Sequence, residues 1–238
     1  MPLIDDQSRD HAFYPESDDE PMAENHRQAE IIRTLILGFQ RLYAGRPDVL
    51  VGGDNFWYPV KGQPKIVVAP DTMVIVDLPA PPDIRTMGSY RQWEFGGHVA
   101  LAIEVLSPSN TWTEMVRKRQ FYDRHGADEY WAFDPDTGGL EAWVRDGTAL
   151  RELPVGEDGF ISPATGVVVN VLDGDLVVSD PGGQRRWLCP LEEAMRAETE
   201  AARAETEAAR ADEASRRVSE LEARLAVLEA ARLEDGTR

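Results

Sequence analysis

The sequence has 238 residues, of which 42% are hydrophobic, and a formal net charge of −18 at pH 7. This length and apolar content exclude an intrinsically disordered protein and allow a sizeable core. The negative charge excludes nucleic-acid binding through a basic surface alone, and the single cysteine, Cys189, excludes an intrachain disulfide and a zinc site built from thiolates.

Neither a membrane span nor a secretory signal is expected. No apolar run is long enough to cross a bilayer, and residues 1–6 lack a basic start followed by an apolar segment. We therefore expect a cytoplasmic protein that has no membrane partner.

The first residues predict a leader followed by a helix. Residues 1–20 are acidic and interrupted by proline, which favours a flexible segment. From Pro21 apolar residues recur at helical spacing up to Tyr43, after which glycine and proline end the helix. His26 and Glu30, near its start, are either solvated residues of the first turn or side chains that point into a functional site.

The next segment contains an unusual aspartate. Strands are predicted at 49–51 and 56–60, and the β-branched run at 66–76 indicates a central strand covered on both faces. Asp71 interrupts this run directly after Pro70. A carboxylate at such a position is costly unless it is paired or bound to a metal. The structural alternative is an aspartate that caps a backbone N–H group at a bulge.

Residues 78–97 form a connection rich in proline and glycine, of a length that is often found in lids and binding loops. Arg85 and Arg91 are the basic residues of this connection that are best placed to contact a phosphate. Isolated arginines are more often plain surface residues, which is the alternative here.

A second central strand is predicted at 99–106, with Glu104 among apolar neighbours. Residues 107–111 offer several side chains that could cap the following helix. On that helix Glu114, Lys118 and Tyr122 are spaced at i, i+4 and i+8 and share one face. This face carries either an exposed Glu–Lys pair or one side of a functional site.

The remaining strands are predicted as a hairpin of 130–133 with 140–145, followed by short strands between 166 and 188 that complete or edge the sheet. The predicted domains are thus a leader at 1–20, an α/β domain at 21–188 and a helix at 189–238. In the helix, residues 197–203 repeat as 204–210. A coiled-coil spacing follows at Val218, Leu221, Leu225 and Leu228. We expect this helix to form a homo-oligomer or bind a partner; the alternative is a helix that folds back on its own domain.

The acids of the two central strands suggest a divalent-metal site. Asp71, Glu104 and the backbone carbonyl of Val105 could supply three oxygen ligands to Mg²⁺ or Mn²⁺. Lys118, on the adjacent helix, could stabilise charge that develops on a phosphate.

This pattern resembles the PD-(D/E)xK nuclease superfamily, and a longer set of motifs is more specific. It comprises residues 69–74 (APDTMV), 103–111 (IEVLSPSNT), 114–118, 121–122, 126–131 (GADEYW) and 134–135. Together these motifs resemble the Uma-two family of bacterial restriction-endonuclease-like proteins, from Met22 to Leu188. Two departures are that Leu106 occupies the usual lysine position of the superfamily and that Glu114 stands where many members have Asp.

The resemblance implies a restriction-endonuclease-like mixed sheet flanked by helices, with a long C-terminal helix. It also implies that Asp71 and Glu104 bind the metal and that Lys118 is the catalytic lysine. His26, Glu30, Glu114 and Tyr122 are candidate supporting groups because of their positions on the two predicted helices. The expected function is Mg²⁺-dependent hydrolysis of DNA phosphodiester bonds by a metal-activated water. The alternatives are a catalytically idle nuclease fold that assembles through its coiled coil, and a hydrolase of a small phosphoester.

Overall fold

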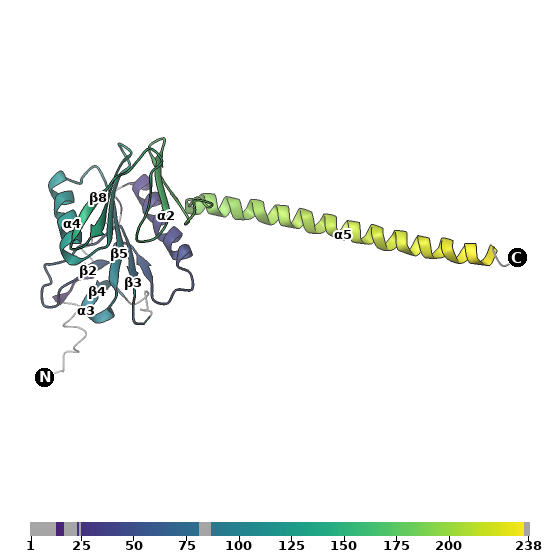
Figure 1. Cartoon of the computed structure of the whole chain (residues 1–238), viewed down its shortest axis with the longest axis horizontal. Coiled ribbons are helices and arrows are strands. Elements are labelled where there is room, and N and C mark those ends of the chain that lie inside the picture. The colour runs from purple at the N-terminus through teal and green to yellow at the C-terminus, as the bar shows by residue number, and fades with distance from the viewer. Residues whose placement is uncertain (1–12, 17–22, 24, 81–86, 236–238) are drawn as a thin grey trace. The chain divides into compact units, whose positions relative to one another are not determined.

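The structure is a computed structural model that describes residues 13–16, 23, 25–80 and 87–235, with side-chain environments up to residue 225. The chain divides into two compact units, Met1–Cys189 and Pro190–Arg238 (Figure 1). The first unit is a mixed α/β domain, and the second consists of one long helix.

The helices and strands of the first unit follow one another in a mixed order. In chain order they are α2 (His26–Leu42), β1 (Leu50–Gly52), β2 (Phe56–Tyr58), β3 (Thr72–Val76), β4 (Ser89–Arg91), α3 (Gln92–Phe95), β5 (His98–Val105), α4 (Trp112–His125), β6 (Glu129–Asp134), β7 (Gly139–Asp146), β8 (Ala149–Leu153), β9 (Phe160–Ile161), β10 (Val168–Leu172) and β11 (Asp175–Ser179).

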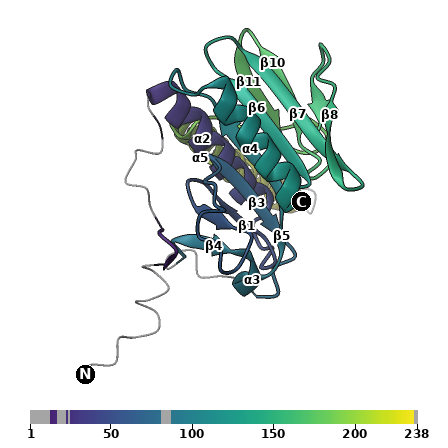
Figure 2. The same cartoon turned by 90° about the vertical axis from the view of Figure 1, so that its left-hand side faces the viewer.

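A six-stranded mixed sheet forms the centre of this unit, in the order β1-β3-β5-β6-β7-β8. Only β5 and β6 pair in parallel, and α4 makes the crossover between them, as parallel pairing requires. The other neighbouring strands are antiparallel. The carboxyl end of β5 therefore lies beside the carboxyl end of β6, and α4, the helix that follows β5, crosses one face of this strand pair (Figure 2).

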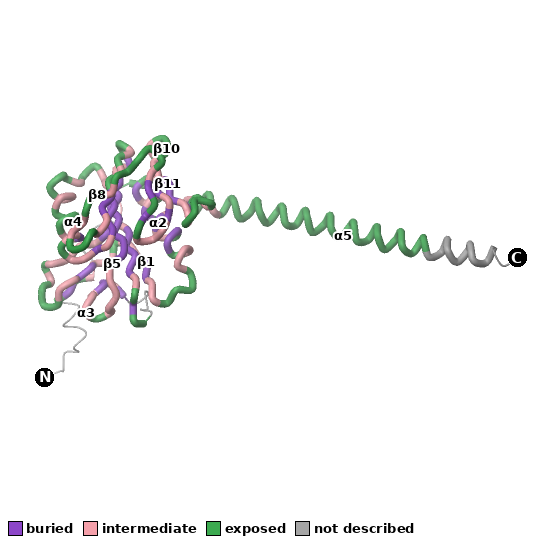
Figure 3. Tube along the Cα trace, viewed as in Figure 1, coloured by how far each residue is buried: buried purple, intermediate pink, exposed green. Residues whose placement is uncertain are grey.

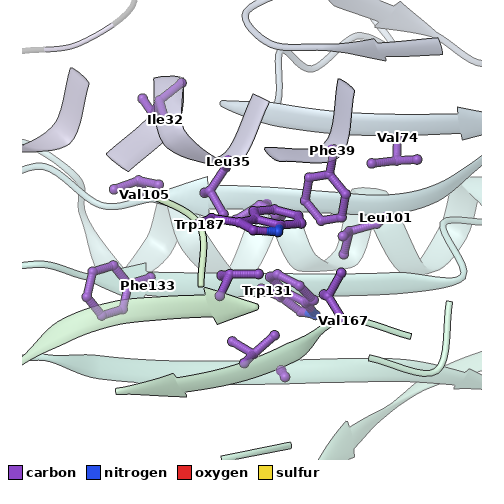
Figure 4. Packing of buried hydrophobic residues seen from close by; sticks show 14 of the residues in the cluster. Ile32, Leu35, Phe39, Val74, Leu101, Val105, Trp131, Phe133, Val167 and Trp187 are labelled. Atoms are coloured by element: carbon purple, nitrogen blue, oxygen red, sulfur yellow. The ribbon is translucent and has the colours of Figure 1, made fainter. Parts of the chain in front are cut away.

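Two hydrophobic clusters cover the two faces of the sheet. On one face α2 and the three-stranded sheet β11-β10-β9 bury an aromatic core that includes Phe39, Trp131 and Trp187 (Figure 4). On the other face α4 and the parallel pair β2–β4 bury Trp57, Tyr122 and other residues. Figure 1 shows α2 and α4 on opposite sides of β5. The mixed α/β fold with helices flanking a mixed sheet was therefore predicted correctly.

The position of Asp71 differs from the prediction. The strand expected at 66–76 begins only at Thr72, and residue 71 lies in a bend before it, with a single antiparallel bridge farther upstream at Val68. Pro70 has no N–H group to donate to a ladder, so the regular pairing starts after it. Asp71 therefore precedes the strand instead of interrupting it.

Two other expectations were wrong. The late strands β9, β10 and β11 do not edge the main sheet but form a sheet of their own. The segment between the predicted hairpin and residue 166, where no strand was predicted, contains the edge strand β8, whose polar and exposed residues gave no apolar alternation. The connection at 78–97 also contains a short strand, β4, and the one-turn helix α3.

Part of the predicted leader contacts the domain. The Tyr14 ring is buried and lies 5.1 Å from that of Tyr58 between ring centroids, and its hydroxyl accepts a hydrogen bond from the backbone of Gly62 at 2.7 Å. The Tyr58 hydroxyl donates to the Pro15 carbonyl at 2.7 Å. Residues 13–16 are therefore held in place, whereas residues 1–12 and 17–20 of the expected leader lie outside the described residues.

The second unit is α5 (Pro190–Asp235), a helix of 46 residues. Its side chains are exposed from residue 194 to residue 225, and these include Val218, Leu221 and Leu225 of the predicted seam (Figure 3). The side chain of Leu228 lies outside the described residues. Within the described part of the chain, no helix combines the length and the apolar composition needed to cross a membrane.

Candidate active site

Glu104 is the centre of a buried polar cluster at the end of β5. Glu104 is only 2% exposed, and the strand around it is apolar. One carboxylate oxygen, Oε2, accepts a hydrogen bond from Nζ of Lys118 at 2.8 Å, and the other, Oε1, accepts a short hydrogen bond from the Tyr122 hydroxyl. Both oxygens therefore have donors, as a buried carboxylate requires.

Asp71 joins the cluster from the bend before β3. Its Oδ2 atom accepts a hydrogen bond from the backbone N–H of Val105 at 2.6 Å. Burial, followed by the negative charge of Glu104, raises the pKa of the Asp71 carboxyl to about 8, against the opposing effects of the Val105 hydrogen bond and the Lys118 charge. The predicted structural alternative, an aspartate that caps a backbone N–H group, therefore describes a real contact, and it coexists with the clustering of the two acids.

Helix α4 brings two donors to these acids because Lys118 and Tyr122 are one turn apart. The hydroxyl of Thr111 caps the helix by accepting from the Glu114 N–H at 3.2 Å, and Gly126 ends it in the left-handed conformation that suits glycine. Burial lowers the pKa of Lys118, but the charge and hydrogen bond of Glu104 outweigh this effect and the pKa is raised. Burial and the charge of Glu104 raise the pKa of the Tyr122 hydroxyl well above its ordinary value. Both groups thus remain protonated as donors at neutral pH.

Gln28 is a member of the site that we did not predict. This residue of α2 is 5% exposed, and its Nε2 atom donates to the carbonyl oxygen of Val105 at 2.7 Å. A sequence signal was present, since Gln28, Ile32, Leu35 and Phe39 form the buried stripe of the helix. A polar residue on such a stripe needs a buried partner.

The other predicted candidates lie apart from the cluster or at its edge. His26 and Glu30 are exposed on α2, and no described hydrogen bond or ion pair joins them to the cluster. Glu114 is at the edge, with Oε1 4.0 Å from Nζ of Lys118 and 3.3 Å from Nδ2 of Asn110. Arg91 forms an ion pair with Glu94 at 3.1 Å, and Arg85 lies outside the described residues.

Comparison with known protein families assigns the chain to a family. The profile of a family described as Uma2, putative restriction endonuclease, matches residues 17–181, which is more than half of the chain. The chain belongs to the Uma2 family. The match spans all the clustered residues, from Gln28 to Tyr122, and ends before α5.

A solved structure and the curated proteins were also compared. The crystal structure of a putative nuclease of the DUF820 group from Anabaena variabilis is 15% identical, covers 65% of this chain and 83% of its own, and has a TM-score of 0.46. Among curated proteins, none matches the chain.

Membership of the restriction-endonuclease-like Uma2 family implies a divalent metal ion. The oxygen donors of this chain fit such an ion. Mg²⁺ is typically held by one or two carboxylates and completes its shell with water and substrate phosphate. Asp71 and Glu104 offer two carboxylates, and the Val105 carbonyl, which accepts from Gln28, retains a second lone pair. No group of three or more His, Cys, Asp or Glu side chains able to hold a metal occurs among the described residues. The fit is therefore to a hard ion that keeps several waters.

Proposed function

We propose that this member of the Uma2 family is an endonuclease that hydrolyses phosphodiester bonds of DNA with Mg²⁺ or Mn²⁺. The observation that carries the proposal is the meeting of Asp71, Glu104 and Lys118, three residues from separate segments, at the carboxyl end of β5. Two buried carboxylates close to each other have a high electrostatic energy unless a cation interacts with both. Such a pair is expected where an ion is bound.

Each residue of the cluster has a distinct part in this proposal. Asp71, Glu104 and the Val105 carbonyl would hold the ion, which when bound supplies a Lewis acid for the phosphate and acidifies water. Gln28 fixes the orientation of the Val105 carbonyl. Tyr122 holds one oxygen of Glu104, so that this carboxylate keeps its orientation when Lys118 moves toward a phosphate. The Lys118 ammonium then stabilises the charge that develops on the phosphate during attack.

Cleavage of supercoiled plasmid by the full chain, with Mg²⁺, Mn²⁺ or a chelator, tests this function. We expect nicking that needs the metal and that is lost in Asp71→Asn and Glu104→Gln. Glu152→Gln, which changes an exposed glutamate of β8, is the matched control and should cleave like the wild type. Equal cleavage by all four proteins would contradict the proposal, because it would point to another site or to a contaminant.

The alternative is a catalytically idle nuclease fold that acts as an assembly module. It is favoured by the charge of −18 and by the exposed apolar residues of α5. Calorimetric titration with Mn²⁺ separates the two functions. An absence of heat, together with an oligomer that is lost when residues after Pro190 are removed, would favour the module.

We also propose that α5 joins copies of this chain, whichever function holds. Val218, Leu221 and Leu225 are 53–64% exposed at a spacing of three and four residues, which is the seam of a coiled coil. Light scattering of the full chain should show an oligomer, and Leu221→Glu with Leu225→Glu should reduce it to a monomer. The control Glu220→Gln changes a neighbouring residue without placing a charge in the seam.

A further inference from the structure

A pocket of about 240 Å³ lies beside the candidate active site, between α4 and the β6–β7 hairpin. Its floor is formed by Tyr130 and Trp143, whose rings stack at 5.1 Å between centroids, and by Ala132 opposite Glu141. Ala132 is small where its neighbours on this face are large, and this leaves room above the strand. The small side chain of Ala132 beside the larger aromatic side chains thus creates the pocket.

One residue in the wall of this space carries an unpaired polar group. The hydroxyl of Tyr130, a residue that lines the pocket and is only 1% exposed, has no hydrogen-bond partner among the described residues. Burial raises the pKa of this hydroxyl, so it stays protonated. A buried hydroxyl without a partner is costly and uncommon in folded proteins. The oxygen is closed off from the space in this conformation, so a ligand would bond to it, and remove the cost, only after a small movement of the neighbouring side chains.

The wall that α4 contributes is suited to a flat group. Trp112, the first residue of the helix, lines the pocket and is 76% exposed. An exposed tryptophan at the mouth of a pocket offers a ring face for stacking. The guanidinium of Arg119 lies over the Trp143 ring at 5.3 Å from its centroid and adds a second planar surface.

The charged residues that line the pocket determine which kind of ligand it can bind. Glu141 and Asp134 line it together with Arg119, so acceptors outnumber the single cation. Asp134 is largely used by its own turn, since it accepts from Asp136 and Thr137, whereas Glu141 is an exposed acceptor. A phosphate would be repelled by the two acids, but a neutral planar group with amino donors would be accepted. Nucleobases such as adenine and cytosine have this chemistry.

The pocket and the polar cluster are separated by one ring. Tyr130 packs on Tyr122 with ring centroids 4.7 Å apart, and the Tyr122 hydroxyl donates to Glu104. Leu106, the residue that follows β5, lines the pocket two positions after Glu104. A base seated in the pocket would therefore belong to a nucleotide close to the scissile phosphate.

We infer that this pocket binds an unstacked nucleobase of the substrate, so that the chain acts on DNA that is single-stranded or locally unpaired near the cleavage point. This inference rests on the proposed function. It also explains how a chain with a net charge of −18 binds DNA: stacking and hydrogen bonds to one base replace part of the phosphate contacts that a basic surface supplies.

Fluorescence anisotropy of the full chain in chelator, where cleavage is absent, tests the inference. The probes are a labelled single-stranded oligonucleotide, its duplex, and the single strand with abasic sites. We expect tightest binding to the intact single strand. Trp112→Ala should weaken that binding roughly tenfold or more, as expected for the loss of one stacked base. Tyr130→Phe, which removes only the unpaired hydroxyl, should weaken it by a smaller factor without lowering the melting temperature.

Ile161→Ala, at an exposed position of β9 outside the pocket, is the control and should bind like the wild type. Equal binding of single strand and duplex, equal binding by Trp112→Ala and the wild type, or no binding at all would overturn the inference. Failure of the proposed function is seen separately: base-dependent binding without any metal-dependent cleavage would leave the pocket in place and remove the nuclease. Metal-dependent cleavage that is unchanged in the pocket variants would instead support the nuclease and remove the inference about the pocket.

Discussion

The Nζ atom of Lys118 lies 2.8 Å from Oε2 of Glu104, although 14 residues separate the two in the sequence. The lysine reaches the strand acid from the second turn of α4. A lysine two residues after the glutamate is the usual arrangement in the PD-(D/E)xK pattern, but that position is Leu106 here, which lines the pocket between α4 and the β6–β7 hairpin.

Replacement of this lysine tests whether it serves both stability and catalysis. Lys118→Met leaves the buried Glu104 without its cation, and we expect a loss of about 2 kcal/mol in the free energy of unfolding. This is less than a fully buried ion pair would lose, because Lys118 is partly exposed. Urea denaturation with and without Mn²⁺ measures it. The metal should restore more stability to Lys118→Met than to the wild type, and the variant should not cleave plasmid. Equal stabilisation of both proteins would contradict the shared role.

Metal binding should depend strongly on pH. Since an ion binds the ionised carboxylate and the Asp71 pKa is about 8, binding must release a proton below that pH. We expect the Mn²⁺ affinity to rise by about tenfold per pH unit up to pH ~8 and then to level off. Calorimetry at several pH values measures the slope. A flat profile in the wild type would show that Asp71 is not a ligand.

The stability of the metal-free protein should change with the opposite sign. The pKa of Asp71 in the folded protein is raised above its ordinary value of 3.8, so its contribution to stability is complete below pH ~4 and is lost as the pH rises through about 8. Asp71→Asn should remove this part of the pH dependence. Melting temperatures in chelator between pH 5 and pH 9, for the wild type and this variant, provide the measurement; parallel curves would refute the expectation.

Gln28 should influence metal affinity through the Val105 carbonyl. Gln28→Met removes the donor to this carbonyl and should cost about 1 kcal/mol of stability, because a buried acceptor loses its bond. Gln28→Glu instead places a third carboxylate beside the two acids, so it should destabilise the metal-free protein and bind Mn²⁺ more tightly than the wild type. Weaker Mn²⁺ binding by Gln28→Glu than by Gln28→Met would show that the residue lies outside the reach of the ion.

Gly53 should be essential for the position of Asp71. A Cβ atom on Gly53 would lie 2.2 Å from the carbonyl oxygen of Asp71 and 2.7 Å from Cδ1 of Ile36, so the backbone that carries the acid must shift. Gly53→Ala should lower both the melting temperature and cleavage. In the control, Gly156→Ala, the nearest atom would be at 3.7 Å. If Gly53→Ala cleaves DNA as fast as the wild type does, then cleavage does not depend on the exact position of Asp71.

The sequence predicted the principal elements because their periodicities are local. Helix α4 carries its own caps at Thr111 and Gly126, and β5 is an apolar run with one acid, so both were found within a few residues. The edge strand β8 could not be found in this way, since its pairing with β7 and not its composition makes it a strand. Strands β10 and β11 were recognised and the two-residue β9 was not, and their separate sheet depends on packing against Phe39 and Trp131 from distant segments.

The candidate site was predicted in part for the same reason. A carboxylate among apolar residues signalled Glu104, and helical spacing placed Lys118 and Tyr122 on one face. Gln28 was missed because its partner, the Val105 carbonyl, is 77 residues away. The pocket between α4 and the β6–β7 hairpin could not be predicted at all, because it arises where Ala132 meets Glu141 across two strands.

The bond from the Val105 N–H to Asp71 has a consequence for how the protein would lose activity on heating. It ties the entry of β3 to the exit of β5, two neighbouring interior strands of the main sheet. Local opening of edges and termini leaves such a pair intact, and only global unfolding separates it. Thermal inactivation of the cluster should therefore coincide with the cooperative melting of the domain, with no partly folded form that has lost the site alone.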